Sequence, residues 1–125
     1  MLNTYDAVAN VAVKDLTTAR KFYEGTLGLT QVDAEDDEVI VYGSGSSRIN
    51  VYRSQYAGTN KATAVTWAVD DIEAEVRALK AKSVKFEHYA DMPDVKLEGD
   101  VHVFGDTKVA WFKDPDGNIL NIISR

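Results

Sequence analysis

Apolar and polar residues alternate along several short segments of the chain, which is the pattern of strands with one buried face. The closing segment shows it best, because two apolar runs flank Asp114-Pro-Asp-Gly117. Proline and glycine suit the second and fourth positions of a type I turn, so the spacing predicts a hairpin over residues 107–124. Further strands are predicted near residues 8–13, 30–34, 38–42, 48–53, 62–69 and 85–89.

Helix-period apolar stripes follow the strands that end near Val13 and Val69. The first stripe contains Leu16, Ala19, Phe22, Tyr23 and Leu27, and the second contains Ile72, Val76 and Leu79. Asp15 and Asp71 stand at the starts, where a carboxylate can accept hydrogen bonds from free N–H groups. We therefore expect helices over about 16–27 and 71–82.

The order of these elements repeats. Ala12-Val-Lys-Asp-Leu16 and Ala68-Val-Asp-Asp-Ile72 begin the same strand-to-helix unit, and three strands follow each helix. We predict an α+β fold of two βαβββ modules in tandem, about residues 5–54 and 62–125, whose curved mixed sheets enclose a cavity. The polar segment 54–61 would connect the modules, and the whole chain would be a single domain.

The composition and charge of the chain exclude several classes of function and partner. The 125 residues include 45% hydrophobic residues and no cysteine, which excludes disulfides and thiolate chemistry and suits a cytoplasmic protein. A net charge of −6 without a basic stripe argues against nucleic acid as a partner. The N-terminus lacks a secretion signal and no apolar run could cross a bilayer, so we expect no membrane partner.

A set of short motifs resembles the vicinal oxygen chelate superfamily, which includes glyoxalase I, extradiol dioxygenases and bleomycin-resistance proteins. The motifs are Asn10-Val-Ala-Val-Lys-Asp-Leu16, Arg20-Lys-Phe-Tyr23, Leu27-Gly-Leu29 and Trp111-Phe-Lys-Asp-Pro-Asp-Gly-Asn-Ile-Leu120. They are caps, core positions and turns, so they specify the fold better than the chemistry. The resemblance implies sheets curled around a cavity and, commonly, a homodimer.

Metal-using relatives carry four His or Glu ligands, and the resemblance places those positions at Val8, Asn50, Ala64 and Asn121 in this chain. Aliphatic side chains offer no donor atom, and neutral amides compensate little of the charge of a divalent ion. We therefore predict no metal and no cofactor at the family position.

Strand alternation assigns a set of side chains to the concave faces, where they would line a mostly apolar bowl with a few amides and hydroxyls. The predicted ligand-binding residues from the strands are Asn10, Asn50, Tyr52, Thr66, Trp111 and Asn121. Trp67 falls on the opposite, helix-covered side. Asn50 and Asn121 are the most informative, because a buried amide needs a partner.

The segment between Phe86 and Lys108 is too long for an ordinary turn and too apolar for a solvated loop. It adds His88, Met92, His102 and Phe104 to the predicted ligand-binding residues. Our preferred interpretation is that the segment forms a flap over the bowl. The alternatives are an extra strand or a dimer contact. Apolar and polar residues alternate in Val101-His-Val-Phe104, as a short strand would require.

These features favour a metal-free protein that binds a small organic ligand of aromatic or mixed polarity in a homodimer. An alternative is a metal-independent lyase or isomerase in which His88 or His102 transfers a proton. A metal-dependent glyoxalase or dioxygenase fits the residues less well. Whether the protein is an enzyme stays open at this stage.

Overall fold

The computed structural model describes residues 1–35 and 37–124. The first half contains a 3₁₀ turn (Leu2–Thr4), β1 (Ala9–Val13), α1 (Leu16–Arg20), the π-helical segment η2 (Lys21–Thr26), β2 (Thr30–Glu35), β3 (Val39–Ser44) and β4 (Ser47–Arg53). The second half contains β5 (Thr63–Ala68), α2 (Ile72–Ala81), β6 (Phe86–Glu87), β7 (Lys96–Glu98), β8 (Val101–Phe104), β9 (Thr107–Lys113) and β10 (Ile119–Ser124).

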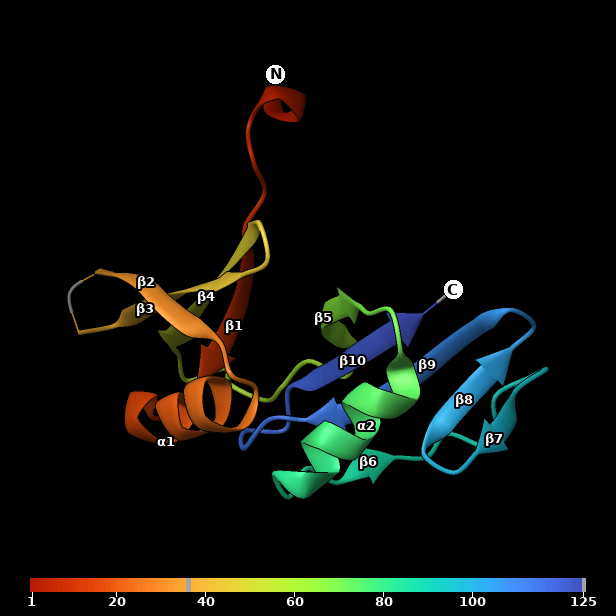
Figure 1. Ribbon diagram of the computed structural model, residues 1–125. Coiled ribbons are helices and arrows are strands. Elements are labelled where there is room, and N and C mark those ends of the chain that lie inside the picture. The colour runs from red at the N-terminus through yellow and green to blue at the C-terminus, as the bar shows by residue number, and fades with distance from the viewer. Residues whose placement is uncertain (36, 125) are drawn as a thin grey trace.

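Within the described residues the strands form two mixed sheets, which lie beside each other in Figure 1. The first sheet has the order β1-β4-β3-β2 and the second the order β5-β10-β9-β8-β7. In each sheet the strand before the helix pairs in parallel with the last strand, while the other neighbours are antiparallel. The predicted α+β class is confirmed.

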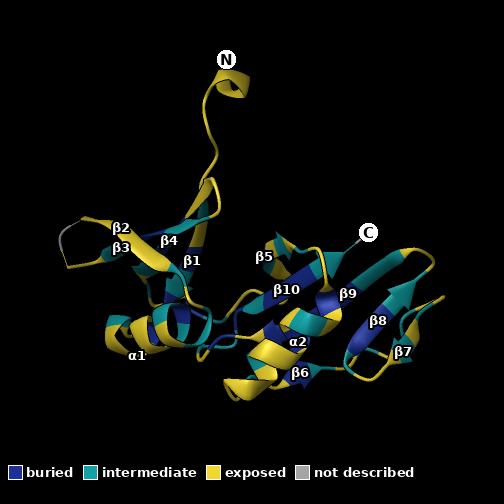
Figure 2. Ribbon diagram, in the orientation of Figure 1, coloured by how far each residue is buried: buried dark blue, intermediate teal, exposed yellow. Residues whose placement is uncertain are grey.

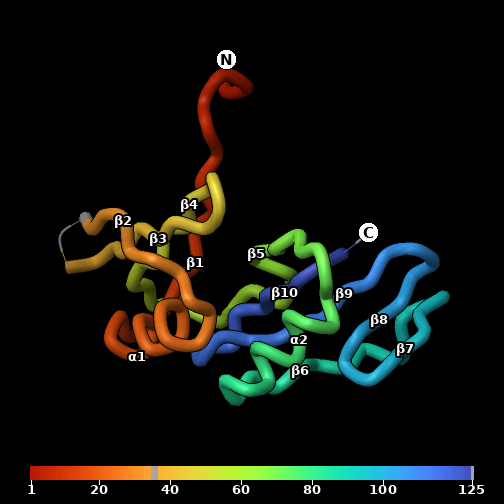
Figure 3. The backbone as a smooth tube through the Cα atoms, in the orientation of Figure 1, coloured from red at the N-terminus to blue at the C-terminus, as the bar shows by residue number. Residues whose placement is uncertain are grey.

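The second half differs from the first by an inserted hairpin. β6 and β8 pair with successive parts of the same edge of β9, and β7 pairs with β8. The preferred interpretation of the whole 87–106 segment as a flap is therefore wrong for residues 96–104, which extend the sheet at the right of Figure 3. The alternating run Val101-His-Val-Phe104 forms a strand, because its backbone N–H and C=O groups pair with those of β9.

Both predicted helix caps are present. An oxygen of the Asp15 carboxylate accepts a hydrogen bond from the Thr17 N–H, and Asp71 accepts one from the Ala74 N–H. The first helix widens after Arg20 into η2, where the Leu27 N–H donates to the Phe22 carbonyl five residues earlier. The helical stretch covers about the predicted range, although its second part is not α-helical.

The core lies between each sheet and the helices that cover it (Figure 2). Val11 and Val13 of β1 are buried under the helix, as their parity predicts, while Asn10, which precedes them, is exposed. The largest fully buried side chains include Tyr23, Tyr42 and Phe112. The opposite faces of the sheets carry no helix and remain more exposed.

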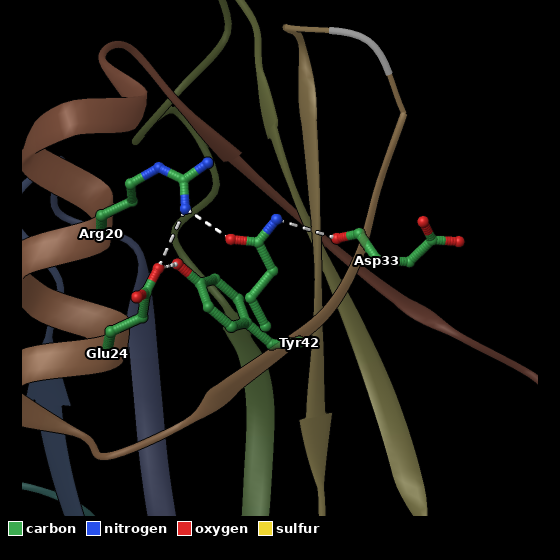
Figure 4. Close-up of polar contacts among 5 residues, drawn as sticks. Arg20, Glu24, Asp33 and Tyr42 are labelled. Atoms are coloured by element: carbon green, nitrogen blue, oxygen red, sulfur yellow. Dashed lines mark hydrogen bonds and ion pairs between the residues drawn. The ribbon is translucent and has the colours of Figure 1, made fainter.

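A polar network joins α1 and η2 to the first sheet on the helix side (Figure 4). The Tyr42 hydroxyl donates to Oε2 of Glu24 at 2.7 Å, and Nη1 of Arg20 contacts the same oxygen at 3.2 Å. Arg20 also donates to Gln31 on β2 at 2.6 Å. Burial and the bond to Glu24 raise the pKa of Tyr42, so the phenol stays neutral.

The two halves are locked together by η2 and the β9–β10 turn. The buried Tyr23 hydroxyl donates to Oδ2 of Asp114 at 2.7 Å, and Phe22 approaches Phe112 with ring centroids 6.5 Å apart. Asn118 donates from Nδ2 to the Ala12 carbonyl at 2.7 Å and to Asp114 at 2.8 Å. The hairpin turn predicted at Asp114–Gly117 is confirmed by the bond from the Gly117 N–H to the Asp114 carbonyl.

Candidate functional site

The uncovered face of the first sheet carries three of the predicted ligand-binding residues. Asn10 on β1 is the register partner of Asn50 on β4, and Tyr52 lies two residues further along the same strand. Nδ2 of Asn50 donates to Oδ1 of Asn10 at 3.3 Å. Two amides and a half-buried tyrosine ring thus share one face.

The uncovered face of the second sheet carries most of the others. Register pairs Thr66 with Asn121, Asn121 with Trp111, and His102 with Val109, while Phe104 lies two residues beyond His102. Residues opposite each other in register share a face, so the structure brings Thr66, His102, Phe104, Trp111 and Asn121 together. Trp67 lies on the helix side, as predicted.

Asn121 stands out among these residues. Its side chain is only 8% exposed, and its Oδ1 atom is buried without a hydrogen-bond partner. A buried amide oxygen without a partner costs about 1–3 kcal/mol. The face therefore holds an unsatisfied acceptor just below its surface, which a ligand donor could reach once the side chains that cover it move aside.

An aromatic cluster of Tyr89, His102 and Trp111 lies beside Asn121. The Tyr89 and Trp111 rings meet edge to face with centroids 5.3 Å apart, and those of His102 and Trp111 are 4.9 Å apart. Residues just after β6 thus fold over the uncovered face, as a flap would, before the chain enters the β7–β8 hairpin. The half-buried Met92 follows, and its N–H donates to the Tyr89 carbonyl.

His102 is fixed in this cluster by its backbone contact. The Tyr89 N–H donates to Nε2 of His102 at 2.8 Å, so this nitrogen carries a lone pair and Nδ1 carries the ring proton. Burial lowers the pKa of His102 below its usual value, although the backbone of Val109 near the ring opposes this shift. The imidazole is therefore neutral and anchors the chain after β6.

His88 is not part of this cluster. Its Nε2 lies 2.8 Å from Oδ1 of Asp100, and Nζ of Lys80 on α2 lies 2.8 Å from Oδ2 of the same carboxylate. Hydrogen bonds from Lys80 and then His88 hold the pKa of Asp100 below its usual value. The contact with α2 places His88 toward the helix, away from the other candidates.

The residues at the family metal positions do not fit a divalent ion. Val8 and Ala64 have no donor atom, and the Asn50 amide is hydrogen-bonded to Asn10. In the part of the chain that the structure describes, no three His, Asp or Glu side chains are grouped to hold a metal.

Two residues that the sequence analysis did not select also shape the second face. Oγ1 of Thr63 accepts a hydrogen bond from Nε1 of Trp111 at 3.1 Å, which fixes the indole plane. Tyr89 covers the imidazole. Strand alternation did not place Thr63 on this face. The β5–β10 register shifts between Ile119 and Leu120, so the alternation is not regular at Thr63.

The family model for the glyoxalase/bleomycin resistance protein/dioxygenase superfamily matches residues 5–122. The chain belongs to this superfamily. No curated protein is significantly similar to it in sequence. In the described residues no helix has the length and apolar character of a membrane span.

Solved structures of this superfamily share the fold at low identity. A putative glyoxalase family protein from Bacillus anthracis is 17% identical with a TM-score of 0.69, covering 97% of each chain. A lactoylglutathione lyase from Agrobacterium tumefaciens is 16% identical with a TM-score of 0.70, covering 97% of this chain and 93% of that one. An antibiotic-binding protein from a Streptomyces species is 17% identical with a TM-score of 0.68, covering 96% and 94%.

Proposed function

We propose that this superfamily member binds a small organic ligand of aromatic or mixed polarity, without a metal, in a cavity completed by a second copy of the chain. The ligand would contact Trp111, Asn121 and Thr66 of one copy and Asn10, Asn50 and Tyr52 of the other. The observation that carries the proposal is the buried, unpartnered Oδ1 of Asn121 beside an aromatic cluster.

The ligand chemistry follows from this face. The Trp111 ring offers an apolar surface, and its Nε1 is already engaged by Thr63, so the ring would contribute stacking rather than a hydrogen bond. The Asn121 oxygen can accept one hydrogen bond, and the exposed Thr66 hydroxyl can donate or accept. A flat ring system with at least one hydroxyl or N–H group would satisfy both.

The second copy supplies the opposite wall. Within one chain no described hydrogen bond or ring contact joins the Asn10–Asn50 pair to the Trp111–Asn121 face. Each uncovered face therefore needs a partner. The apolar side chains of Leu2 and Tyr5, which are 81% and 74% exposed, add surface that a second copy could bury.

The structural neighbours share the fold and do not decide between binding and catalysis. One is described as an antibiotic-binding protein and another as a lactoylglutathione lyase. The proton-transfer alternative is weaker. His88 is bound to Asp100 and Nε2 of His102 accepts the Tyr89 N–H, while the buried Nδ1 of His102 has no hydrogen-bond partner but already carries the ring proton and cannot act as a base. We therefore propose a binding protein.

A thermal-shift screen tests the proposal. Hydroxylated aromatic compounds such as quercetin and 1,8-dihydroxyanthraquinone are added to protein treated with EDTA, and a binder should raise the midpoint of unfolding. Asn121→Leu should abolish the shift, whereas Gln55→Leu, the same kind of change at an exposed position, should preserve it. A shift that survives Asn121→Leu would overturn the assigned site.

The oligomeric state is measured separately by light scattering. A dimer that Tyr52→Glu converts to monomers would agree with the proposed pairing of the faces, because a charge there would be buried. A wild-type monomer that still binds the same compounds would contradict the shared cavity.

A further inference from the structure

A second cavity lies on the helix side of the sheets, between the two halves of the chain. Its volume is about 230 Å³, and Leu29 and Ser44 of the first half line it together with Trp67, Glu75, Leu79 and Phe112 of the second. Trp67 and Phe112 lie on the helix-covered face of the second sheet, opposite to Trp111 and Asn121. The cavity is therefore distinct from the site proposed above.

The floor of the cavity is flat and aromatic. The half-buried Trp67 ring stacks on the fully buried Phe112 ring, with an angle of 20° between the ring planes and centroids 6.5 Å apart. Nε1 of Trp67 donates to Oγ of Ser44 on β3 at 2.9 Å, which fixes the indole across the boundary between the halves. A flat ring could stack on this floor without reorganising it.

A single carboxylate accompanies the apolar walls. Glu75 and Leu79 are four residues apart on α2 and line the same cavity, as that spacing requires. Among the described residues Glu75 has no hydrogen-bond or ion-pair partner, whereas Glu73 on the same helix binds Lys108 at 2.8 Å. The cavity thus combines an aromatic floor with an unpaired negative charge at its solvent-exposed rim.

We propose that this cavity binds a small aromatic amine, with its ring on Trp67, which Phe112 supports from below, and its ammonium group at Glu75. An apolar cavity of about 150 Å³ can hold benzene, so the larger volume here leaves room for a ring with a short side chain. The net charge of −6 also favours a cationic ligand over an anionic one.

Three probes with nearly the same shape test the charge requirement: 2-phenylethylamine, 2-phenylethanol and 3-phenylpropionate. Binding is followed by the fluorescence of Trp67, which is the sole tryptophan in a Trp111→Phe background. The amine should bind tightest and the carboxylate weakest. A carboxylate that binds as well as the amine, or no saturable response to the amine at millimolar concentration, would overturn the proposal.

Variants locate the binding. Glu75→Gln should weaken amine binding about two- to fivefold and abolish the preference over the alcohol, whereas Glu73→Gln should change neither. Leu79→Trp should fill the cavity and abolish binding of all three probes. Unchanged amine affinity in Glu75→Gln would refute the proposal even if Leu79→Trp failed to fold. Asn121→Leu should not affect the amine, so the two proposed sites can fail independently.

Discussion

The Tyr89 N–H donates to Nε2 of His102 across 2.8 Å, and both rings contact Trp111. This bond ties the segment after β6 to β8 and holds the aromatic cluster on the uncovered face. It requires a neutral imidazole, because protonation of Nε2 would put two N–H groups against each other.

Stability should therefore depend on pH through His102. Burial lowers the pKa of His102 below its usual 6.5. As the pH falls below 6.5, this histidine therefore binds a proton in the unfolded chain more readily than in the folded protein, which favours unfolding. The free energy of unfolding should drop between pH 7 and pH 5. In His102→Gln, whose side-chain oxygen can still accept the Tyr89 N–H, this drop should be smaller. Urea unfolding at several pH values measures this drop, and an unchanged pH slope in His102→Gln would contradict the assignment.

Removing the Tyr23 hydroxyl should loosen the connection between the halves. Tyr23→Phe leaves Oδ2 of the buried Asp114 with the Asn118 amide but without the phenol donor, which should cost about 1–2 kcal/mol in the free energy of unfolding. Tyr56→Phe, at a 67% exposed position, should stay within about 0.5 kcal/mol of the wild type. Chemical denaturation compares the variants, and equal midpoints for the two would argue against this contact.

Gly58 is required by both its conformation and its surroundings. Its φ is +72°, and a Cβ atom there would overlap the carbonyl oxygen of Asp116 in the β9–β10 turn. Gly58→Ala should destabilise the protein by more than about 2 kcal/mol, because strain and overlap act together. Gly105→Ala, with φ +58° and open space, should cost only about 1 kcal/mol. Similar losses in both variants would show that the linker does not pack on the turn.

Acid should weaken the contact between α2 and the inserted hairpin. Lys80 and His88 lower the pKa of Asp100, so this carboxylate stabilises the fold at pH values above its usual 3.8, and the contribution is lost as the pH falls through the folded value. Asp100→Asn should therefore reduce stability at pH 6 more than at pH 3. Asp94→Asn is the comparison variant, and thermal unfolding at the two pH values is the readout. The same loss at both pH values would point to packing instead of charge.

The fold could be predicted largely from local chemistry. Asp15 and Asp71 cap helices whose apolar stripes are explicit in the sequence, and the Asp114–Gly117 turn fixes the last hairpin. The two faces could be assigned from parity, since the pleat repeats every two residues. These predictions need only interactions between residues close in sequence.

The details of the site could not be predicted in this way. The role of Thr63 depends on a register shift between β5 and β10, and that of Tyr89 on where the chain turns after the short β6. His88 was assigned to the ligand site because it shares a long segment with His102, yet Asp100 and Lys80 hold it toward α2. The positions of these side chains depend on contacts between residues far apart in the chain, and such contacts could not be predicted from a single sequence.

Calorimetric titration of EDTA-treated protein with the best aromatic ligand tests the central claim most directly. The account predicts binding at one ligand per chain that needs no divalent ion and is lost in Asn121→Leu. Binding that appears only after a divalent metal is restored, or that Asn121→Leu leaves intact, would contradict it.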